Sequence, residues 1–372
     1  MNSIIYVGMD VHKENYTLCC YSFDEDRLQY SQRIAPDYKM VLKYLEQVRT
    51  RYPDDEIEFV CGYEAGCLGY TLYHQLTDHG VKCVILAPTT MPTPKKNKIK
   101  TDKRDAGNIA KCLAFHSYSE VRVPTAEDEA VKEYIRMRDD QKKALKIIKQ
   151  QILALVLRHG YRFDGGKNYW TLKHIAWLRN LNLGGLLQES LQEYLVTYDY
   201  LTDKIERLDK RIEELASDER YRDKVKKLIC LLGIKTLTAL AVIVEIGDFI
   251  RFSKPEKMAA FIGLVPGEDS SGEKQNRGPI TKAGNTHVRR LLVESAQSYT
   301  RGKIGYKSKE LKRRQSGNTP QVIAYADKAN ERLRRKFYRM TLNNKANRNV
   351  AATAIARELA CFIWGLMTDN IA

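Results

Sequence analysis

The strongest constraint on the fold is the order of β-rich and helical segments in the first 120 residues. Three β-rich runs come first and are separated only by the short polar stretches HKEN and FDED. These runs are SIIYVGMDV (3–11), YTLCCYS (16–22) and LQYSQRI (28–34). Connections this short join antiparallel neighbours, so the chain is expected to begin with a three-stranded meander.

After the meander, helical and strand patterns alternate. A helix is expected from Tyr38 to Arg51, a strand at EIEFVCGYE (56–64) and a helix from Tyr70 to Asp78. A strand at VKCVILA (81–87) and a helix from Asp105 to His116 follow. This order predicts an α/β domain of the ribonuclease H-like class, in which helices flank a mixed sheet.

Four acidic residues occupy positions that such a fold brings together. In this topology the first strand is central and the fourth lies beside it. Asp10 closes the first of these strands and Glu64 closes the fourth. Asp102 and Asp105, in KTDKRDA, share one face at the start of the following helix because they are three residues apart. The sequence therefore predicts that the four carboxylates converge.

Clustered carboxylates repel one another unless a cation neutralises them. All-oxygen ligation suits Mg²⁺ or Mn²⁺, and two such ions can assist phosphoryl transfer. The basic residues around the second acidic pair are expected to contact phosphate: Lys95, Lys96, Lys98, Lys100, Lys103 and Arg104. The alternative is that each acid is an ordinary surface residue, or, for Asp102, a helix N-cap.

The middle of the chain, residues 126–226, is expected to be helical. Apolar residues repeat there with alternating spacings of four and three, which is a heptad seam. The seam consists of Leu187, Leu191, Tyr194, Tyr198, Leu201, Ile205, Leu208, Ile212 and Leu215. An intramolecular helical hairpin and a dimeric coiled coil both fit this pattern.

Positive charge is concentrated near the C-terminus. Between Lys274 and Asn349 there are 20 Lys or Arg and only 4 Asp or Glu, an excess that equals the net charge of the whole chain, +16. A basic third on a neutral body indicates a nucleic-acid binder, because a merely solubilising surface would intersperse both signs. The N-terminus lacks the features of a signal peptide and no apolar stretch reaches the length of a membrane span, so a cytosolic protein without a membrane partner is expected.

Together, these motifs give the chain a family resemblance. GMDVHK, YEAG and KTDKRDA resemble the N-terminal DEDD domain, related to Holliday-junction resolvases such as RuvC, of bacterial insertion-sequence transposases of the IS one-ten group. These are described as bridge-RNA-guided recombinases. The stretch from Leu231 to Leu292 resembles the C-terminal transposase domain of that family. The resemblance covers nearly the whole chain in the right order.

The resemblance implies roles for particular residues. Asp10, Glu64, Asp102 and Asp105 would bind Mg²⁺. The family pattern P-x-x-x-x-S-G reads from Pro266 to Gly272, which makes Ser271 the nucleophile, with Ser270 beside it. The serine would attack a DNA phosphate and form a phosphoserine, and strand exchange would pass through a Holliday junction. Residues just downstream are candidates to stabilise charge at the phosphate: Lys282, His287, Arg289 and Arg290.

The resemblance also implies partners. A guide RNA would pair with donor and target DNA, so that base pairing selects the sequence while the protein holds backbones. The family acts as a tetramer in which the DEDD domain of one protomer completes the serine site of another, and the heptad helix is the natural dimer element.

The expected organisation is therefore a RuvC-like DEDD domain at residues 1–125, a coiled-coil region at 126–226 and a mostly helical transposase domain at 227–372. Two other functions remain open. One is a metal-dependent junction nuclease that cuts by water attack. The other is a catalytically inert nucleic-acid-binding relative. Loss of Ser271 would be tolerated by the nuclease but not by the recombinase.

Overall fold

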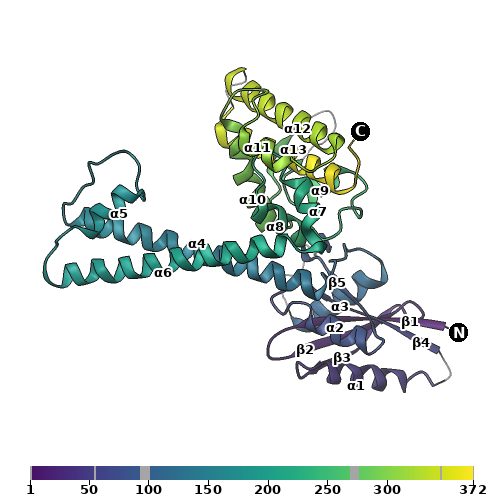
Figure 1. The fold of residues 1–372 in the computed structure, drawn as a ribbon. Coiled ribbons are helices and arrows are strands. Elements are labelled where there is room, and N and C mark those ends of the chain that lie inside the picture. Colours follow the sequence, from purple (N-terminus) through teal and green to yellow (C-terminus); the bar gives the residue numbers. More distant parts are fainter. Residues whose placement is uncertain (1, 54–55, 93–100, 269–275, 344–345, 372) are drawn as a thin grey trace. The chain divides into compact units, whose positions relative to one another are not determined.

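The structure, a computed structural model, describes residues 2–53, 56–92, 101–268, 276–343 and 346–371. The chain separates into two compact units, Met1–Val123 and Pro124–Ala372. We call them unit 1 and unit 2 and describe each by itself (Figure 1). The finer three-part division expected from the sequence stays a prediction.

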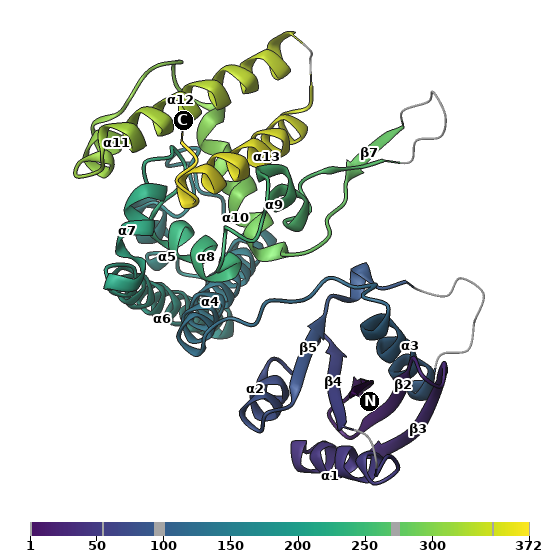
Figure 2. The ribbon, with the colours of Figure 1, turned by 90° about the vertical axis from the view of Figure 1, so that its right-hand side faces the viewer.

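Unit 1 is built on a five-stranded mixed sheet. Its strands are β1 (Asn2–Val11), β2 (Tyr16–Ser22), β3 (Arg27–Ile34), β4 (Glu56–Glu64) and β5 (Lys82–Leu86). They lie in the order β3-β2-β1-β4-β5. The first three pair antiparallel, whereas β1 pairs with β4, and β4 with β5, in parallel. The mixed α/β fold predicted from the sequence is confirmed, with β1 at the centre of the sheet (Figure 2).

Helices cover both faces of this sheet. They are α1 (Tyr38–Arg49), α2 (Thr71–Asp78) and α3 (Asp102–Ala114), with a short 3₁₀ turn, η1, at Pro88–Thr90. Ile5, Val7 and Met9 of β1 pack in one apolar core with residues of α1 and α2. Tyr6 packs in a second core, on the opposite face, with residues of α3. The alternation of side chains along β1 therefore assigns its even-numbered residues to α3.

The packing of α3 on β1 is close enough to exclude a side chain at Gly8. A Cβ atom built on Gly8 would lie 2.0 Å from the Ala106 carbonyl oxygen and 2.3 Å from the Ala110 nitrogen. Both atoms belong to the backbone of α3, which cannot give way as a side chain could. Glycine at this position is what allows helix and strand to touch backbone to backbone.

Unit 2 is mostly helical. Its first part contains α4 (Ala126–Arg158), α5 (Leu172–Arg179), α6 (Gly185–Ala216) and α7 (Glu219–Leu228). Then follow α8 (Thr236–Ile246), α9 (Pro255–Phe261), the two-stranded sheet of β6 (Pro266–Glu268) and β7 (Arg277–Ile280), and α10 (Thr286–Ala296). The last elements are η2 (Gln297–Thr300), α11 (Lys309–Gln315), α12 (Pro320–Tyr338), η3 (Arg339–Asn343) and α13 (Arg348–Met367).

The heptad seam packs within the chain. The long helices α4 and α6 lie side by side (Figure 1). The α6 residues Leu191, Tyr198 and Leu201 are buried, as predicted, but Leu195 is buried where the heptad predicts Tyr194. The departure is local, because the buried residues from Tyr198 to Ile212 follow the predicted heptad again. The hairpin alternative is therefore seen, and the dimeric coiled coil stays a prediction.

The last helix, α13, is a core helix of unit 2. Ten of its residues are buried, among them Ile355, Leu359 and Ile363, and it packs against α9, α10 and α12. By length and composition alone it is apolar enough to cross a membrane, contrary to the expectation from the sequence that no stretch would be. Arg357 and Glu358 interrupt the run of apolar residues, and a core helix of a soluble protein passes the same test.

Gly8→Ala is expected to lower the free energy of unfolding of unit 1 by about 1–3 kcal/mol or more, because the added methyl group overlaps the α3 backbone. Urea-induced unfolding of the full chain measures the change. Gly66→Ala is the control, since its methyl group would lie 3.8 Å from the nearest atom, the Glu64 carbonyl oxygen. Equal effects of the two substitutions would contradict the packing argument.

Candidate metal centre

Two of the predicted acids lie at one end of the sheet. β1 and β4 run parallel, and their last paired residues are Met9 and Tyr63, so Asp10 and Glu64 are the next positions in register. A Cβ on Gly8 or on Gly62 would meet residues of α3. Asp10 and Glu64 come two residues later on their strands and therefore share the α3 face of the sheet.

The other two acids lie in the first turn of α3. Thr101 is the N-cap of this helix, and its hydroxyl accepts a hydrogen bond from the Arg104 backbone N–H. Asp102 therefore is not the N-cap, which the sequence left open, but the first residue of the helix. Asp102 and Asp105 are both favoured there because the helix dipole is positive at its N-terminus.

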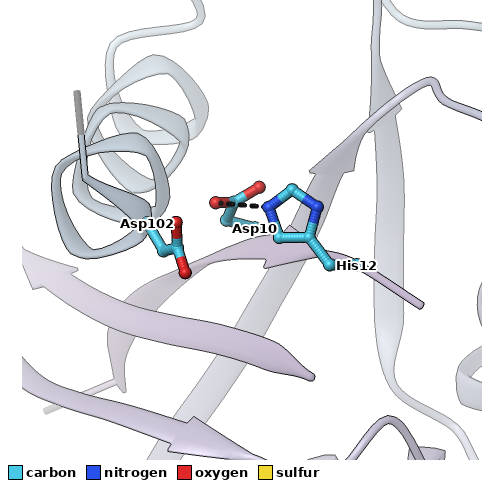
Figure 3. A group of neighbouring side chains, drawn as sticks. All are labelled: Asp10, His12 and Asp102. Carbon is cyan, nitrogen blue, oxygen red and sulfur yellow. Dashed lines mark hydrogen bonds and ion pairs between the residues drawn. The ribbon is translucent and has the colours of Figure 1, made fainter. Parts of the chain in front are cut away.

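The contact at Gly8 brings the start of α3 to the end of β1. Ligand atoms of Asp10, His12 and Asp102 all lie within 4.8 Å of one another. Figure 3 shows these three side chains gathered beside the first turn of the helix. The His12 Nε2 atom lies 3.2 Å from the Asp10 Oδ2 atom. His12 was not among the site residues predicted from the sequence, although it is only two residues beyond Asp10.

The electrostatics of the cluster disfavour a negative charge on Asp10. Burial raises the pKa of the Asp10 carboxyl, and the charges of Asp105 and Asp102 raise it further, against an opposing effect of His12. The side chain is only 17% exposed, so water compensates little of this repulsion. A cation at this position would relieve it.

The acids border an open cleft of about 830 Å³ in unit 1. Asp10, Glu64 and Asp105 line it, together with Arg104 and Lys111. A cleft lined by both carboxylates and cations can hold a metal ion and a phosphate at once. Asp102 is not among the residues that line the cleft, but it belongs to the site because its carboxylate lies close to Asp10 and His12.

The donor set fits a divalent cation. Groups from β1, from the turn after it and from α3 already lie close enough that small side-chain rotations would bring them around one ion, and Glu64 and Asp105 lie at the same cleft. Carboxylate oxygens suit Mg²⁺ and Mn²⁺, and the imidazole of His12 is a donor that Mn²⁺ accepts more readily than Mg²⁺ does.

The predicted phosphate contacts beside this site are only partly described. Lys95, Lys96, Lys98 and Lys100 lie outside the described residues. Lys103 and Arg104 are exposed in the first turn of α3, and Arg104 lines the cleft. Their role as phosphate contacts stays a prediction.

In unit 2 the serine motif falls between the two strands of a small sheet. Ser270 and Ser271 lie outside the described residues. The flanking strands β6 and β7 pair antiparallel, Pro266 opposite Ile280 and Glu268 opposite Arg277. The segment that contains the serines therefore connects the end of β6 to the start of β7.

Arg289 clamps the base of this small sheet. Its Nη1 atom donates to the Ile262 carbonyl oxygen at 2.7 Å and to the Ala283 carbonyl oxygen at 2.9 Å, thereby joining the segments before β6 and after β7. Gly284 allows the close approach, since a Cβ there would lie 1.9 Å from the Phe261 carbonyl oxygen. The phosphate contact of Arg289 stays a prediction, and one nitrogen of its guanidinium is bound to these two carbonyl oxygens. Lys282 is exposed.

His287 lies in a buried ionic network rather than at the surface. Its Nδ1 atom is 2.9 Å from the Glu245 carboxylate and its Nε2 atom is 2.9 Å from the Asp139 carboxylate. Arg136 donates two hydrogen bonds to Glu245, and Arg290 donates to Asp139. The network joins α4, α8 and α10 within unit 2. No local sequence motif could have predicted this network, because the residues that it pairs are about 40 to 150 positions apart in the chain.

The charges in this network support one another. Burial alone would lower the pKa of His287, but its hydrogen bonds to Asp139 and Glu245, together with their charges, raise it overall. Burial alone would raise the pKa of Glu245, but hydrogen bonds from His287, Arg136 and Asn285 lower it to about 2. With a carboxylate 2.9 Å from each ring nitrogen, the geometry favours an imidazolium that donates through both nitrogens.

Comparison with known proteins gives matches over both units. A family model of the DEDD transposase domain of the IS110 group matches residues 7–160, and the model described as "Transposase IS116/IS110/IS902 family" matches residues 226–311. A transposase for insertion sequence element IS1533 from Leptospira borgpetersenii is 33% identical over 91% of this chain and 96% of the relative. A putative transposase, y4qE, from Sinorhizobium fredii is 31% identical over 98% of this chain and 88% of the relative.

A third relative is the transposase for insertion sequence element IS1111A from Coxiella burnetii. It is 24% identical over 99% of this chain and 91% of the relative. The chain belongs to the IS116/IS110/IS902 family of insertion-sequence transposases, as the resemblance of its motifs predicted. DNA is accordingly its substrate, and its DEDD domain indicates the use of a divalent metal.

Without divalent metal, Asp10→Asn is expected to raise the urea midpoint of unit 1, because the substitution removes a buried charge that its neighbours disfavour. Adding Mn²⁺ should stabilise the wild type but not the variant. Glu14→Gln, at an exposed position beyond the same strand, is the control and should change neither midpoint. A wild type that gains nothing from Mn²⁺ would argue against the metal centre.

His287 predicts a pH dependence of stability. Because its folded pKa is raised above the ordinary value of 6.5, its contribution is fully present below pH 6.5 and is lost as the pH rises through the folded pKa. His287→Gln should lose about 2 kcal/mol at pH 6 and less above the folded pKa. Urea unfolding from pH 6 to 9 measures this, with the exposed His159→Gln as control. A pH-independent loss would contradict a charged His287.

Proposed function

We propose that this transposase is an RNA-guided recombinase that joins donor and target DNA by serine attack on DNA phosphates. The observation that carries the proposal is the gathering of Asp10, Asp102 and His12 at the end of β1, with Glu64 and Asp105 at the same cleft. Because the chain belongs to a family of DEDD transposases, we interpret this arrangement as a centre for metal-assisted phosphoryl transfer.

The four acids are proposed to hold one or two Mg²⁺ or Mn²⁺ ions. Such an ion, when bound, would neutralise the acids and stabilise negative charge on a DNA phosphate. The chain's own part is to orient that phosphate. Asp10 and Glu64 are fixed by the rigid strands, Asp102 and Asp105 by the first turn of α3, and Arg104 at the rim of the cleft is proposed to contact a neighbouring phosphate.

Ser271 is proposed as the nucleophile. Its Oγ atom would attack the phosphorus of a DNA phosphodiester, a phosphoserine bond would form, and a deoxyribose hydroxyl would leave. Attack by the hydroxyl of another strand would then release the serine and join the strands through a Holliday junction. The support is the P-x-x-x-x-S-G pattern between β6 and β7 and the clamp by Arg289 at the base of these strands.

Guide RNA and both DNA partners are proposed to lie on basic surfaces. Unit 2 carries the excess of positive charge found in the sequence, and several of its cations are exposed: Arg301, Lys303, Lys309, Lys312 and Arg313. Such surfaces hold phosphate backbones without reading bases, which suits a protein whose sequence choice is delegated to base pairing.

The active form is proposed to be a homo-oligomer, a dimer that assembles to a tetramer in the bacterial cytoplasm. The hairpin of α4 and α6 uses the heptad seam internally, but apolar side chains remain exposed on its outer faces. Ile147 and Leu157 on α4, and Leu186, Val196 and Tyr200 on α6, are each more than half exposed. Exposed apolar side chains along a helical hairpin are typical of a protein–protein interface.

A trapping assay tests the proposal. Purified protein, RNA transcribed from the flanks of its gene, Mg²⁺ and labelled donor and target DNA are mixed and resolved on a denaturing protein gel. The wild type and Ser270→Ala should give a DNA-linked protein band. Ser271→Ala and Asp10→Asn should reduce that band by at least 100-fold, because each removes a group required for the covalent step.

The other outcomes identify the alternatives. Cleavage without a covalent band, undiminished in Ser271→Ala, would mean that the acids act through water and that the protein is a metal-dependent nuclease. Nucleic-acid binding with neither cleavage nor linkage would mean a catalytically inert relative. Omitting the RNA should abolish linkage if the guide is required.

A further inference from the structure

We propose that His12 is a metal ligand in the acidic centre and that its imidazole makes the site prefer Mn²⁺, or a similar transition-metal ion, over Mg²⁺. This inference rests on the proposed function insofar as it needs a divalent ion at the four acids. It adds to that function a nitrogen donor and a choice of metal, neither of which the DEDD pattern contains.

The position of His12 is set by the chain on both sides of it. β1 ends at Val11, and the His12 backbone N–H donates to the Asn15 carbonyl oxygen at 3.0 Å, which closes a tight turn before β2. The turn holds the residue at the end of the central strand, two positions from Asp10. Within the described residues, its ring nitrogen is directed at the Asp10 carboxylate, 3.2 Å away (Figure 3).

The three donors lie close to the separation that one ion requires. Ligand atoms bound about 2.1 Å from a common ion are at most about 4.2 Å apart. The ligand atoms of Asp10, His12 and Asp102 are all within 4.8 Å of one another before any ion is bound. His12 is 54% exposed, so its ring is free to make the small rotation that would bring the set to coordination distance.

The chemistry of the donors favours a transition metal. Mg²⁺ takes oxygen ligands and keeps much of its water, whereas Mn²⁺ and its heavier neighbours also accept imidazole nitrogen. Replacing one oxygen or water ligand by His12 therefore costs Mg²⁺ more than Mn²⁺. A structural role explains His12 less well, because its ring is half exposed and a single hydrogen bond to Asp10 adds little to stability.

The direct test detects the nitrogen on the metal. Full-length protein labelled with ¹⁵N only in histidine is loaded with one equivalent of Mn²⁺, and pulsed electron paramagnetic resonance measures coupling between the Mn²⁺ electron spin and ¹⁵N. We expect coupling in the wild type and in His79→Ala, and none in His12→Ala. His79 is a matched control, since it is an exposed histidine of unit 1 whose Nδ1 atom bonds the Gln75 carbonyl oxygen in α2.

Affinity gives a second readout. By competition titration, His12→Ala should weaken Mn²⁺ binding about 10-fold or more and Mg²⁺ binding about 2-fold or less. Circular dichroism and urea unfolding establish that the variant is folded. Mn²⁺ binding without ¹⁵N coupling, or an equal loss for both metals, would overturn the role of His12 while leaving the acidic centre in place. A wild type that binds no Mn²⁺ would overturn this inference and the metal part of the proposed function together.

Discussion

The backbone contact between α3 and β1 at Gly8 determines where the acids of unit 1 meet. Because a side chain at Gly8 would overlap the Ala106 and Ala110 backbone, the helix can lie directly on the central strand only with glycine there. The helix then starts beside the end of that strand, which brings Asp102 to Asp10 and His12. The electrostatic cost appears in the raised pKa of Asp10, and a cation is the simplest way to offset it.

Unit 2 uses charge in a different way. The largely buried carboxylates of Asp139 and Glu245 are compensated by His287, Arg290 and Arg136, so that α4, α8 and α10 are joined by hydrogen-bonded ion pairs. Removing one partner of such a network leaves a largely buried charge uncompensated and destabilises the packing of α4 against α8 and α10. Arg289, the neighbour of Arg290 on α10, joins the segments before β6 and after β7.

Much of unit 1 could be predicted from the sequence, because alternation and short turns fix strand order locally. β2 and β4 have the predicted bounds and β1 begins one residue earlier than predicted, so the places of Asp10 on β1 and Glu64 on β4 could be predicted. His12 was missed because the prediction considered only carboxylates as ligands. The network of His287 could not be predicted, since it depends on how helices far apart in the sequence pack. For the same reason, counting charges could not separate engaged cations such as Arg289 and Arg290 from exposed ones such as Lys312.

If the fold of unit 1 gathers these side chains around a divalent ion, anomalous scattering from crystals of the full chain soaked in Mn²⁺ should locate that ion. We expect a peak about 2.2 Å from carboxylate oxygens of Asp10 and Asp102, with Glu64 and Asp105 in direct or water-mediated contact. No peak at saturating Mn²⁺, with the acids paired instead to lysine or arginine side chains, would contradict this expectation and would make the cluster a surface salt-bridge patch.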